Sequence, residues 1–223
     1  MFKRKEIIKI LNQAQHIDAK YELFGASTHQ YRLNPPISES FVRNVETQYG
    51  FTLPEEYFQF ITEIGDGGAG PDYGIRPFTN ILIKGSSPGA EKFREAYRYS
   101  LANSFTPRKM RTDEVEEYAI ATRKAYEQNP DRYFIYKDFE HNDLNDTDGF
   151  FFLGTHGCQW DFGLITSGER RGQVFDTDNE GAYCFVSYNF NEFYQNWLNR
   201  ISDTERFQQE LEERREIRRK IRI

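Results

Sequence analysis

The spacing of hydrophobic residues predicts helices in the first third of the chain. Apolar residues recur every three or four positions over 7–17, which indicates an amphipathic helix against the body of the protein. A second helix is expected to begin after Ser38, a good N-cap, and to end at Gly50. A third begins at Pro54, where proline suits the first turn, and stops at Gly65.

The second half of the chain changes to the alternating pattern of short strands. Aromatic and β-branched runs occur at 132–136, 149–154, 162–166, 173–175 and 183–186, separated by Gly, Asp and Asn turns. These runs predict an antiparallel meander. Between the two halves, residues 86–137 are charged and weakly periodic, with helical pieces expected at 90–99 and 114–128. The whole pattern predicts an α+β fold, with a mixed, mostly antiparallel sheet and helices packed against it.

The end of the chain returns to helix. Residues 190–201 have core spacing, whereas 203–223 form a charge ladder in which Glu210 can pair with Arg214 and Glu216 with Lys220. We expect one domain at 1–202, the helix in 1–20 included, followed by a solvated, charged helical tail at 203–223. A helix that docks a partner from Phe207 onward is the alternative.

Composition places the chain among globular proteins. It has 223 residues, 38% of them hydrophobic, which is enough for a full hydrophobic core without stabilising disulfides or metal ions. Two cysteines cannot form the disulfide framework of a small secreted domain, and no apolar run approaches the length of a membrane span. We therefore expect a cytoplasmic protein with no membrane span.

The charge is unevenly distributed. The formal net charge is −6, with 29 basic and 35 acidic residues. Residues 1–20 carry a net of +3 and residues 203–223 a net of +1, so residues 21–202 carry −10. A body of this charge repels phosphate backbones and attracts cationic proteins. Direct nucleic-acid binding is therefore disfavoured, and a basic protein partner is favoured.

Two acidic runs are candidates for contact with such a partner. They comprise Asp138, Glu140, Asp143, Asp146 and Asp148 in the first run, and Asp176, Asp178 and Glu180 in the second. The second run begins like a calcium loop, but its twelfth position is Ser187 rather than the required glutamate. Asp176 and Asp178 serve equally well as turn residues between strands, so both interpretations stay open.

The segment from Gly65 to Pro71 has the most unusual local composition. Gly65, Gly67 and Gly70 satisfy the spacing of a dinucleotide-binding loop, which requires a strand before it and a helix after it. Here a helix precedes and Pro71 follows. We interpret the segment as a turn into an extended stretch at 73–78 rather than a phosphate site.

Few side chains are candidates for catalysis or metal binding. His156 and Cys158 are the one Cys/His cluster, and neighbours two apart on a strand share a face, but no protease signature surrounds them. With Cys184 they supply only three ligands for zinc, without paired spacing. Nothing in the spacing of carboxylates recommends glycoside hydrolysis. We expect no catalytic residues, no metal site and no cofactor, with a Cys158/His156 hydrolase as the weaker alternative.

The succession of motifs resembles the SUKH superfamily of Smi/Knr-type domains over residues 20–201, apart from the middle segment. The first half matches at Leu53-Pro54-Glu55-Glu56-Tyr57, Phe60, 64–71 and Tyr73-Gly74-Ile75, and Phe24-Gly25, His29 and Tyr31-Arg32-Leu33 fit the start of bacterial members. The second half matches at Phe152-Leu153-Gly154, Gly157-Cys158, Leu164-Ile165, Gly168, 171–175, Phe193 and Trp197-Leu198. Phe175 stands where members often carry tryptophan.

The resemblance implies structural roles for the motif residues. They are Pro54, Gly65, Gly67, Gly68, Gly70, Pro71, Tyr73, Gly74, Gly157, Cys158, Gly172 and Trp197. It also implies a binding function without catalysis. Bacterial members of the family are mostly immunity proteins that neutralise a cognate polymorphic toxin, commonly a nuclease, and a fungal branch regulates cell-wall synthesis through protein contacts. The expected partner is therefore a toxin with a basic nuclease cleft, and the alternative is a regulatory interaction module.

Overall fold

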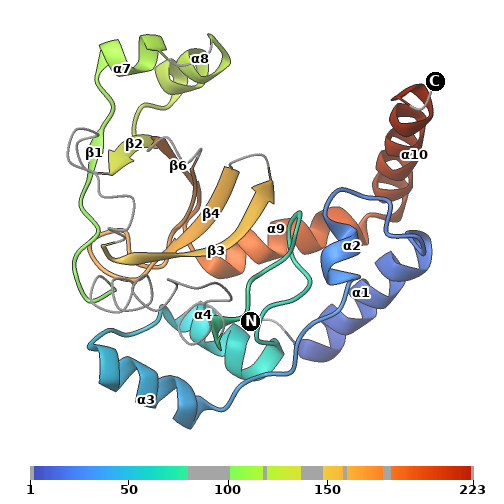
Figure 1. The fold of residues 1–223 in the computed structure, drawn as a ribbon, viewed down its shortest axis with the longest axis horizontal. Coiled ribbons are helices and arrows are strands. Elements are labelled where there is room, and N and C mark those ends of the chain that lie inside the picture. The colour runs from blue at the N-terminus through green and yellow to red at the C-terminus, as the bar shows by residue number, and fades with distance from the viewer. Residues whose placement is uncertain are drawn as a thin grey trace, which may run out of the picture.

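The computed structural model of the protein describes residues 3–79, 101–117, 120–136, 148–157, 160–177 and 182–221 (Figure 1). The helices are α1 (Arg4–Ile17), α2 (Ala26–His29), α3 (Glu39–Tyr49), α4 (Glu55–Gln59), the π-helical turn η1 (Phe60–Ile64), α7 (Thr112–Glu117), α8 (Ile120–Gln128), α9 (Phe190–Ser202) and α10 (Thr204–Ile221). The strands are β1 (Pro107–Lys109), β2 (Tyr133–Tyr136), β3 (Phe150–Gly157), β4 (Trp160–Ile165), β5 (Val174–Thr177) and β6 (Ala182–Ser187). The predicted α+β class is confirmed; the helix expected at 90–99 lies outside the described residues.

Capping residues set the ends of the first helices as the sequence predicts. The Ser38 hydroxyl accepts a hydrogen bond from the amide of Phe41 at 3.3 Å, and Gly50 ends α3 in the left-handed conformation. The helix after Pro54 begins as α4 and then widens into η1 before Gly65. The sequence does not predict this π turn, because the same buried apolar residues suit either helical geometry.

The sheet is antiparallel in every described pairing, with the strand order β1-β2-β6-β5-β4-β3. Strands β3 to β6 form the predicted meander. The meander prediction is wrong for β2, which pairs with β6 through Tyr133 opposite Cys184 and not with β3, its successor in sequence. The connection at 137–149 is much longer than a hairpin turn, so sequence order does not make these two strands neighbours.

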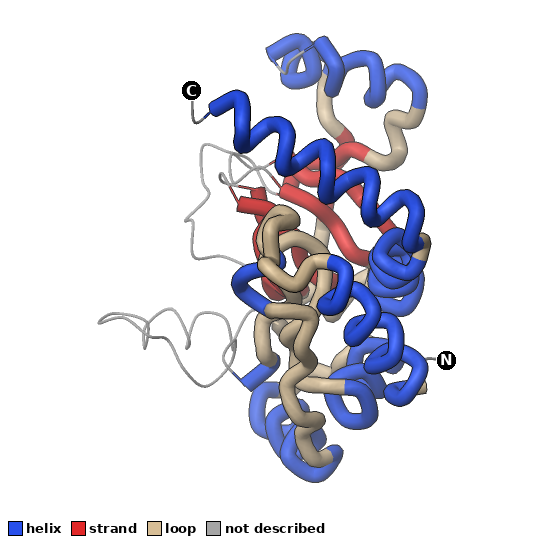
Figure 2. The backbone as a smooth tube through the Cα atoms, turned by 90° about the vertical axis from the view of Figure 1, so that its right-hand side faces the viewer, coloured by secondary structure: helices blue, strands red, loops and turns tan. Residues whose placement is uncertain are grey.

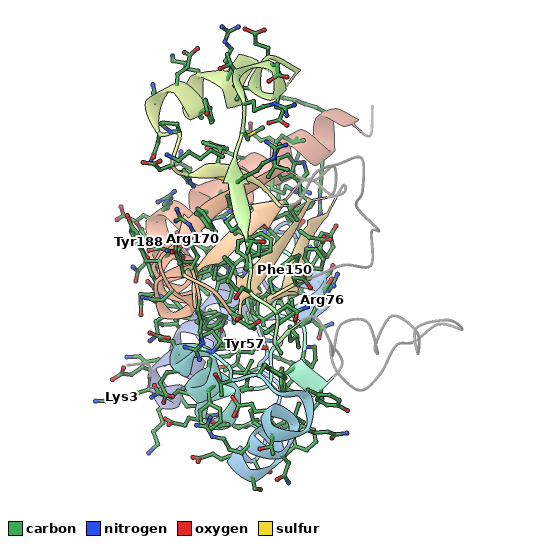
Figure 3. The ribbon with its side chains drawn as sticks, turned by 90° about the vertical axis from the view of Figure 1, so that its left-hand side faces the viewer. Lys3, Tyr57, Arg76, Phe150, Arg170 and Tyr188 are labelled. Carbon is green, nitrogen blue, oxygen red and sulfur yellow. The ribbon has the colours of Figure 1, made fainter. Side chains whose placement is uncertain are left out.

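Helices cover one face of the sheet, and the largest core cluster lies between these helices and the sheet. Tyr57 of α4 is fully buried there, against the rings of Phe151 and Phe190. The opposite face carries a smaller aromatic cluster in which Phe150 packs against Phe105. Figure 3 labels Tyr57 and Phe150 inside the molecule. In Figure 2, α7 and α8 stand apart from the other helices, at the edge of the sheet formed by β1.

The C-terminal helix is part of the packed body over its first half. Phe207 and Leu211 are only 1% and 2% exposed, and the guanidinium of Arg215 lies 2.8 Å from the carboxylate of Glu22. The expectation of a solvated tail is therefore wrong for this half of α10. Charged residues outnumber the two buried apolar ones, which weakens the amphipathic signal in the sequence. Beyond them, Ile217 is half exposed, as the sequence predicts.

The Gly-rich segment turns the chain back on itself. Gly68 has a φ of 96°, and its amide and carbonyl form hydrogen bonds with Ile75 at 2.8 and 2.9 Å. A Cβ on Gly68 would lie 2.4 Å from the carbonyl oxygen of Arg32, so the close approach requires glycine. The stretch expected to be extended at 73–78 contributes only the isolated bridge at Ile75.

Candidate functional site

Several strand ends meet at one end of the sheet. β3 ends at Gly157, directly opposite Trp160, where β4 begins. β5 ends at Thr177, in register with Asp161 of β4, and β6 begins beside it at Ala182. We call this the His156 end of the sheet, after the side chain at its centre. In Figure 1 the loop that follows η1 stands between this end of the sheet and α2.

His156 occupies a β-bulge at this end. Thr155 pairs with Asp161 and Gly157 pairs with Trp160, so His156 is an extra residue with no partner across the ladder. A bulge of this kind re-aims its side chain and increases the local twist. The imidazole of His156 lies against the ring of Phe162, with the ring centres 4.8 Å apart. It therefore sits at the margin of the helix-covered face of the sheet.

Two carboxylates hold this imidazole. Nδ1 of His156 forms a hydrogen bond with the Asp72 carboxylate, and Nε2 lies 3.0 Å from Oδ1 of Asp176 on β5. Burial lowers the pKa of His156, but the hydrogen bonds to Asp176 and Asp72 outweigh this effect and raise the pKa to about 9. The ring is therefore protonated at neutral pH and donates from both nitrogens. With no free lone pair, it is unsuited to act as a general base.

A second histidine, His29, contacts the same loop at Asp72. His29 is buried, its Nδ1 accepts a hydrogen bond from the amide of Tyr31 at 3.0 Å, and it hydrogen-bonds the backbone of Asp72. Burial lowers the pKa of His29 to about 4, so this ring is neutral at neutral pH. Asp72 itself has a φ of 47°, which a residue other than glycine seldom adopts. The loop is therefore held in an unusual conformation by His29 and His156 together.

Three aromatic side chains are exposed beside this cluster. Phe24, Tyr73 and Trp160 are 40%, 37% and 49% exposed, and the rings of Phe24 and Tyr73 meet edge to face at 5.2 Å. A Cβ on Gly157 would lie 2.9 Å from the Tyr73 ring, so glycine leaves room for that ring on β3. Trp160 faces Gly157 across the ladder and shares a face of β4 with Phe162. We call Phe24, Tyr73 and Trp160 the aromatic surface.

The predicted acidic candidates are only partly described, and the structure does not bring the described ones together. Asp176 lies at the His156 end, where its carboxylate is bound to His156 rather than free for a partner. Asp148 lies at the opposite end of the sheet, before β3, and accepts a hydrogen bond from Asn103 at 2.9 Å. The other six lie outside the described residues: Asp138, Glu140, Asp143, Asp146, Asp178 and Glu180.

The motif residues taken from the resemblance mostly occupy structural positions. Pro54 is the N-cap of α4. Gly172 has a φ of 93°, and a Cβ on this residue would lie 3.7 Å from the Cβ of Pro54. Pro71 accepts a hydrogen bond from the amide of Gly74 at 2.7 Å, and Trp197 packs against the His29 ring. Gly65, Gly67, Gly68 and Gly70 build the turn of the Gly-rich segment, where added Cβ atoms would lie 2.7, 2.5, 2.4 and 2.7 Å from neighbouring atoms.

Two members of the motif set differ from the rest. Tyr73 reaches the surface, and Cys158 lies outside the described residues. The structure therefore does not test a contact between Cys158 and His156. The imidazole of His156 is hydrogen-bonded to Asp72 and Asp176. Among the residues that the structure describes, no group of three His, Cys, Asp or Glu side chains is arranged to hold a metal ion.

Sequence reasoning missed Asp72 and the exposure of Phe24 and Trp160. Asp72 follows a Gly-Pro pair, which indicates a turn but not a contact with a strand that lies far along the chain. The one available signal was the placement of His156, a titratable residue near the end of a strand that begins with four apolar residues. None of the helices in the described ranges has the length and apolar character needed to cross a membrane.

Comparison of the chain with family models, with curated proteins and with solved structures finds no match. The likeness to the SUKH superfamily therefore depends on the sequence motifs alone.

Proposed function

We propose that this chain is a non-catalytic immunity protein of the SUKH type, which neutralises a cognate polymorphic toxin by tight association in the cytoplasm. The toxin we expect is a nuclease with a basic cleft. The observation that supports this best is the aromatic surface of Phe24, Tyr73 and Trp160, held in place beside the carboxylates of Asp72 and Asp176.

Rigid, exposed aromatic residues are typical centres of protein interfaces. Tyrosine and tryptophan bury a large area with little loss of side-chain entropy and dominate the energy of many interfaces. Tyr73 is fixed because the neighbouring Asp72 is bound both to His156 and to His29. A loop that is ordered before binding does not lose further conformational entropy in the complex, which favours high affinity.

Charge supports a cationic partner. Residues 21–202 carry a net charge of −10, and the carboxylates of Asp72 and Asp176 lie at the His156 end of the sheet. A nuclease must attract phosphate, so its cleft is positively charged and complements this end.

The test pairs this protein with the toxin domain encoded beside its own gene. Binding is measured by calorimetry for the wild type and for Tyr73→Ala and Trp160→Ala. Each substitution should weaken binding by at least about ten-fold, as expected for an aromatic interface residue. Tyr188→Ala is the matched control, because Tyr188 is 81% exposed and follows β6 at the opposite end of the sheet, beside Arg170 (Figure 3). Loss of binding in the control alone, or no binding by the wild type, would reject the proposal.

A regulatory interaction module that uses α10 is the second candidate function. The exposed Ile217, 49% accessible on the outer half of α10, favours it. Deleting all of 203–223 would remove the buried Phe207 and Leu211 and would damage the core. Removing residues 216–223 instead leaves the packed half intact. Loss of partner binding in this shorter variant would favour the module, and full binding would favour the aromatic surface.

A further inference from the structure

A hollow of about 510 Å³ lies where α10 passes the turn between α1 and α2. Figure 1 shows this helix rising beside that turn. All the residues that line the hollow are charged, and all but one are basic: Lys20, Glu22, Arg215, Arg218 and Arg219. We call it the basic hollow. It is far from typical of this acidic protein, whose residues 21–202 have an excess of carboxylates.

Part of this positive charge is already compensated. Nε of Arg215 lies 2.8 Å from the Glu22 carboxylate, and another nitrogen of its guanidinium lies 2.5 Å from Glu212. Lys20, Arg218 and Arg219 are exposed and form no ion pair within the part of the chain that the structure describes. The lining therefore has three more cationic groups than carboxylates, because Glu22 is its one acidic residue and Arg215 binds it across the two walls.

Both walls are fixed before any ligand arrives. The turn that carries Lys20 is organised by buried Asp18, which accepts hydrogen bonds from the amides of Glu22 and Leu23 at 2.7 and 3.2 Å and from the Tyr31 hydroxyl at 2.9 Å. On α10, positions 215, 218 and 219 have the three- and four-residue spacing that places side chains on one face. The helix dipole favours cations at this end of α10, but it does not account for Lys20 on a different element.

We propose that the basic hollow binds a compact, multiply charged oxyanion of the phosphate type. Its volume is in the range of sites for small ligands, and all of its lining residues are charged, which favours an anion over an apolar group. Guanidinium groups donate paired hydrogen bonds that match phosphate oxygens. A long polyanion would also meet the repulsion of the molecule as a whole, because residues 21–202 carry a net charge of −10. The charge distribution therefore favours a compact anion over nucleic acid or a membrane. This inference does not depend on the proposed function.

The experiment titrates pyrophosphate into the full-length protein by calorimetry, with inorganic phosphate, a short single-stranded oligonucleotide and phosphatidylserine vesicles as parallel probes. We expect saturable binding of one pyrophosphate, tighter than that of phosphate. The triple variant Lys20→Gln, Arg218→Gln, Arg219→Gln should weaken it by at least about ten-fold, because most of the attraction is electrostatic. Arg206→Gln is the control, since Arg206 is exposed on the same helix and does not line the hollow. Its affinity should equal that of the wild type.

Arg215 is left unchanged in these variants because its contact with Glu22 holds the two walls together. Thermal unfolding without ligand checks that the triple variant folds like the wild type. Absence of saturable pyrophosphate binding would overturn the proposal, and so would equal binding by the folded triple variant. Tighter binding of the oligonucleotide or the vesicles through the same three residues would overturn the choice of a compact ligand.

Discussion

His156 joins two parts of the chain that are far apart in sequence. Its imidazole lies between the Asp72 carboxylate of the Gly-rich loop and the Asp176 carboxylate of β5. A protonated ring in this position neutralises part of the repulsion between the two acids and donates a hydrogen bond to each. The exposed position of Tyr73, next to Asp72, depends on this contact.

Replacing His156 by glutamine should therefore destabilise the protein. The substitution removes the positive charge and leaves Asp72 and Asp176 facing each other without it. We expect a loss of roughly 1–3 kcal/mol in the free energy of unfolding, measured by urea denaturation at neutral pH. His16→Gln on the exposed side of α1 is the control and should change stability by less than about 0.5 kcal/mol. Equal stability of the two variants would show that the two hydrogen bonds of His156 contribute little.

The two histidines predict opposite pH dependences. The folded-state pKa of His156 is raised to about 9 from 6.5, so its contribution is complete below pH 6.5 and is lost as the pH rises through 9. The folded-state pKa of His29 is lowered to about 4, so its contribution is present above pH 6.5 and is lost as the pH falls through 4. Unfolding curves of wild type, His156→Gln and His29→Gln across this range test both. The His156→Gln difference should shrink in alkali and the His29→Gln difference in acid; the reverse order would contradict the assignment.

At the scale of elements, local signals predicted most of the fold. The caps at Ser38 and Gly50 and the alternation in β3 to β6 depend on neighbouring residues, and each was found where expected. The pairing of β2 with β6, and the contact of Asp72 with His156, join segments separated by long connections. The spacing of hydrophobic residues along the sequence does not predict such long-range contacts. The aromatic surface was missed for the same reason, because it is assembled from three separate elements.

Helix α10 offers a direct test of packing against solvation. Phe207 is buried against the ring of Tyr31, with ring centres 6.2 Å apart, whereas Ile217 on the same helix is half exposed. Phe207→Ala should lower the free energy of unfolding by about 3–5 kcal/mol through lost contacts and a cavity. Ile217→Ala should cost less than about 0.5 kcal/mol. Urea denaturation of both variants measures the contrast. Equal, small effects would mean that the whole helix is a solvated extension.

At the scale of the molecule, positive and negative charge are unevenly distributed. The body between residues 21 and 202 is strongly negative in sum, whereas the hollow is lined mainly by basic residues of α10. On the same helix, the guanidinium of Arg214 lies 5.4 Å from the ring centre of Phe24, which belongs to the aromatic surface. Phe24 therefore links the two regions through the turn that carries Lys20. A partner that covers the aromatic surface would therefore approach both the Asp72 and Asp176 carboxylates and the cationic side chains of α10.

This arrangement predicts how salt affects association with the proposed toxin. The net charge of −10 on residues 21–202 attracts a basic cleft over distances that salt screens, so the association rate should fall as ionic strength rises. Between about 50 mM and about 500 mM salt, we expect the association rate constant to fall by at least about ten-fold while the dissociation rate constant changes much less. Stopped-flow mixing at several salt concentrations measures both rates. Tyr73→Ala should increase the dissociation rate and leave the salt dependence of association intact, because Tyr73 carries no charge. An association rate that is indifferent to salt would mean that the acidic body does not steer the partner, even if the aromatic surface binds it.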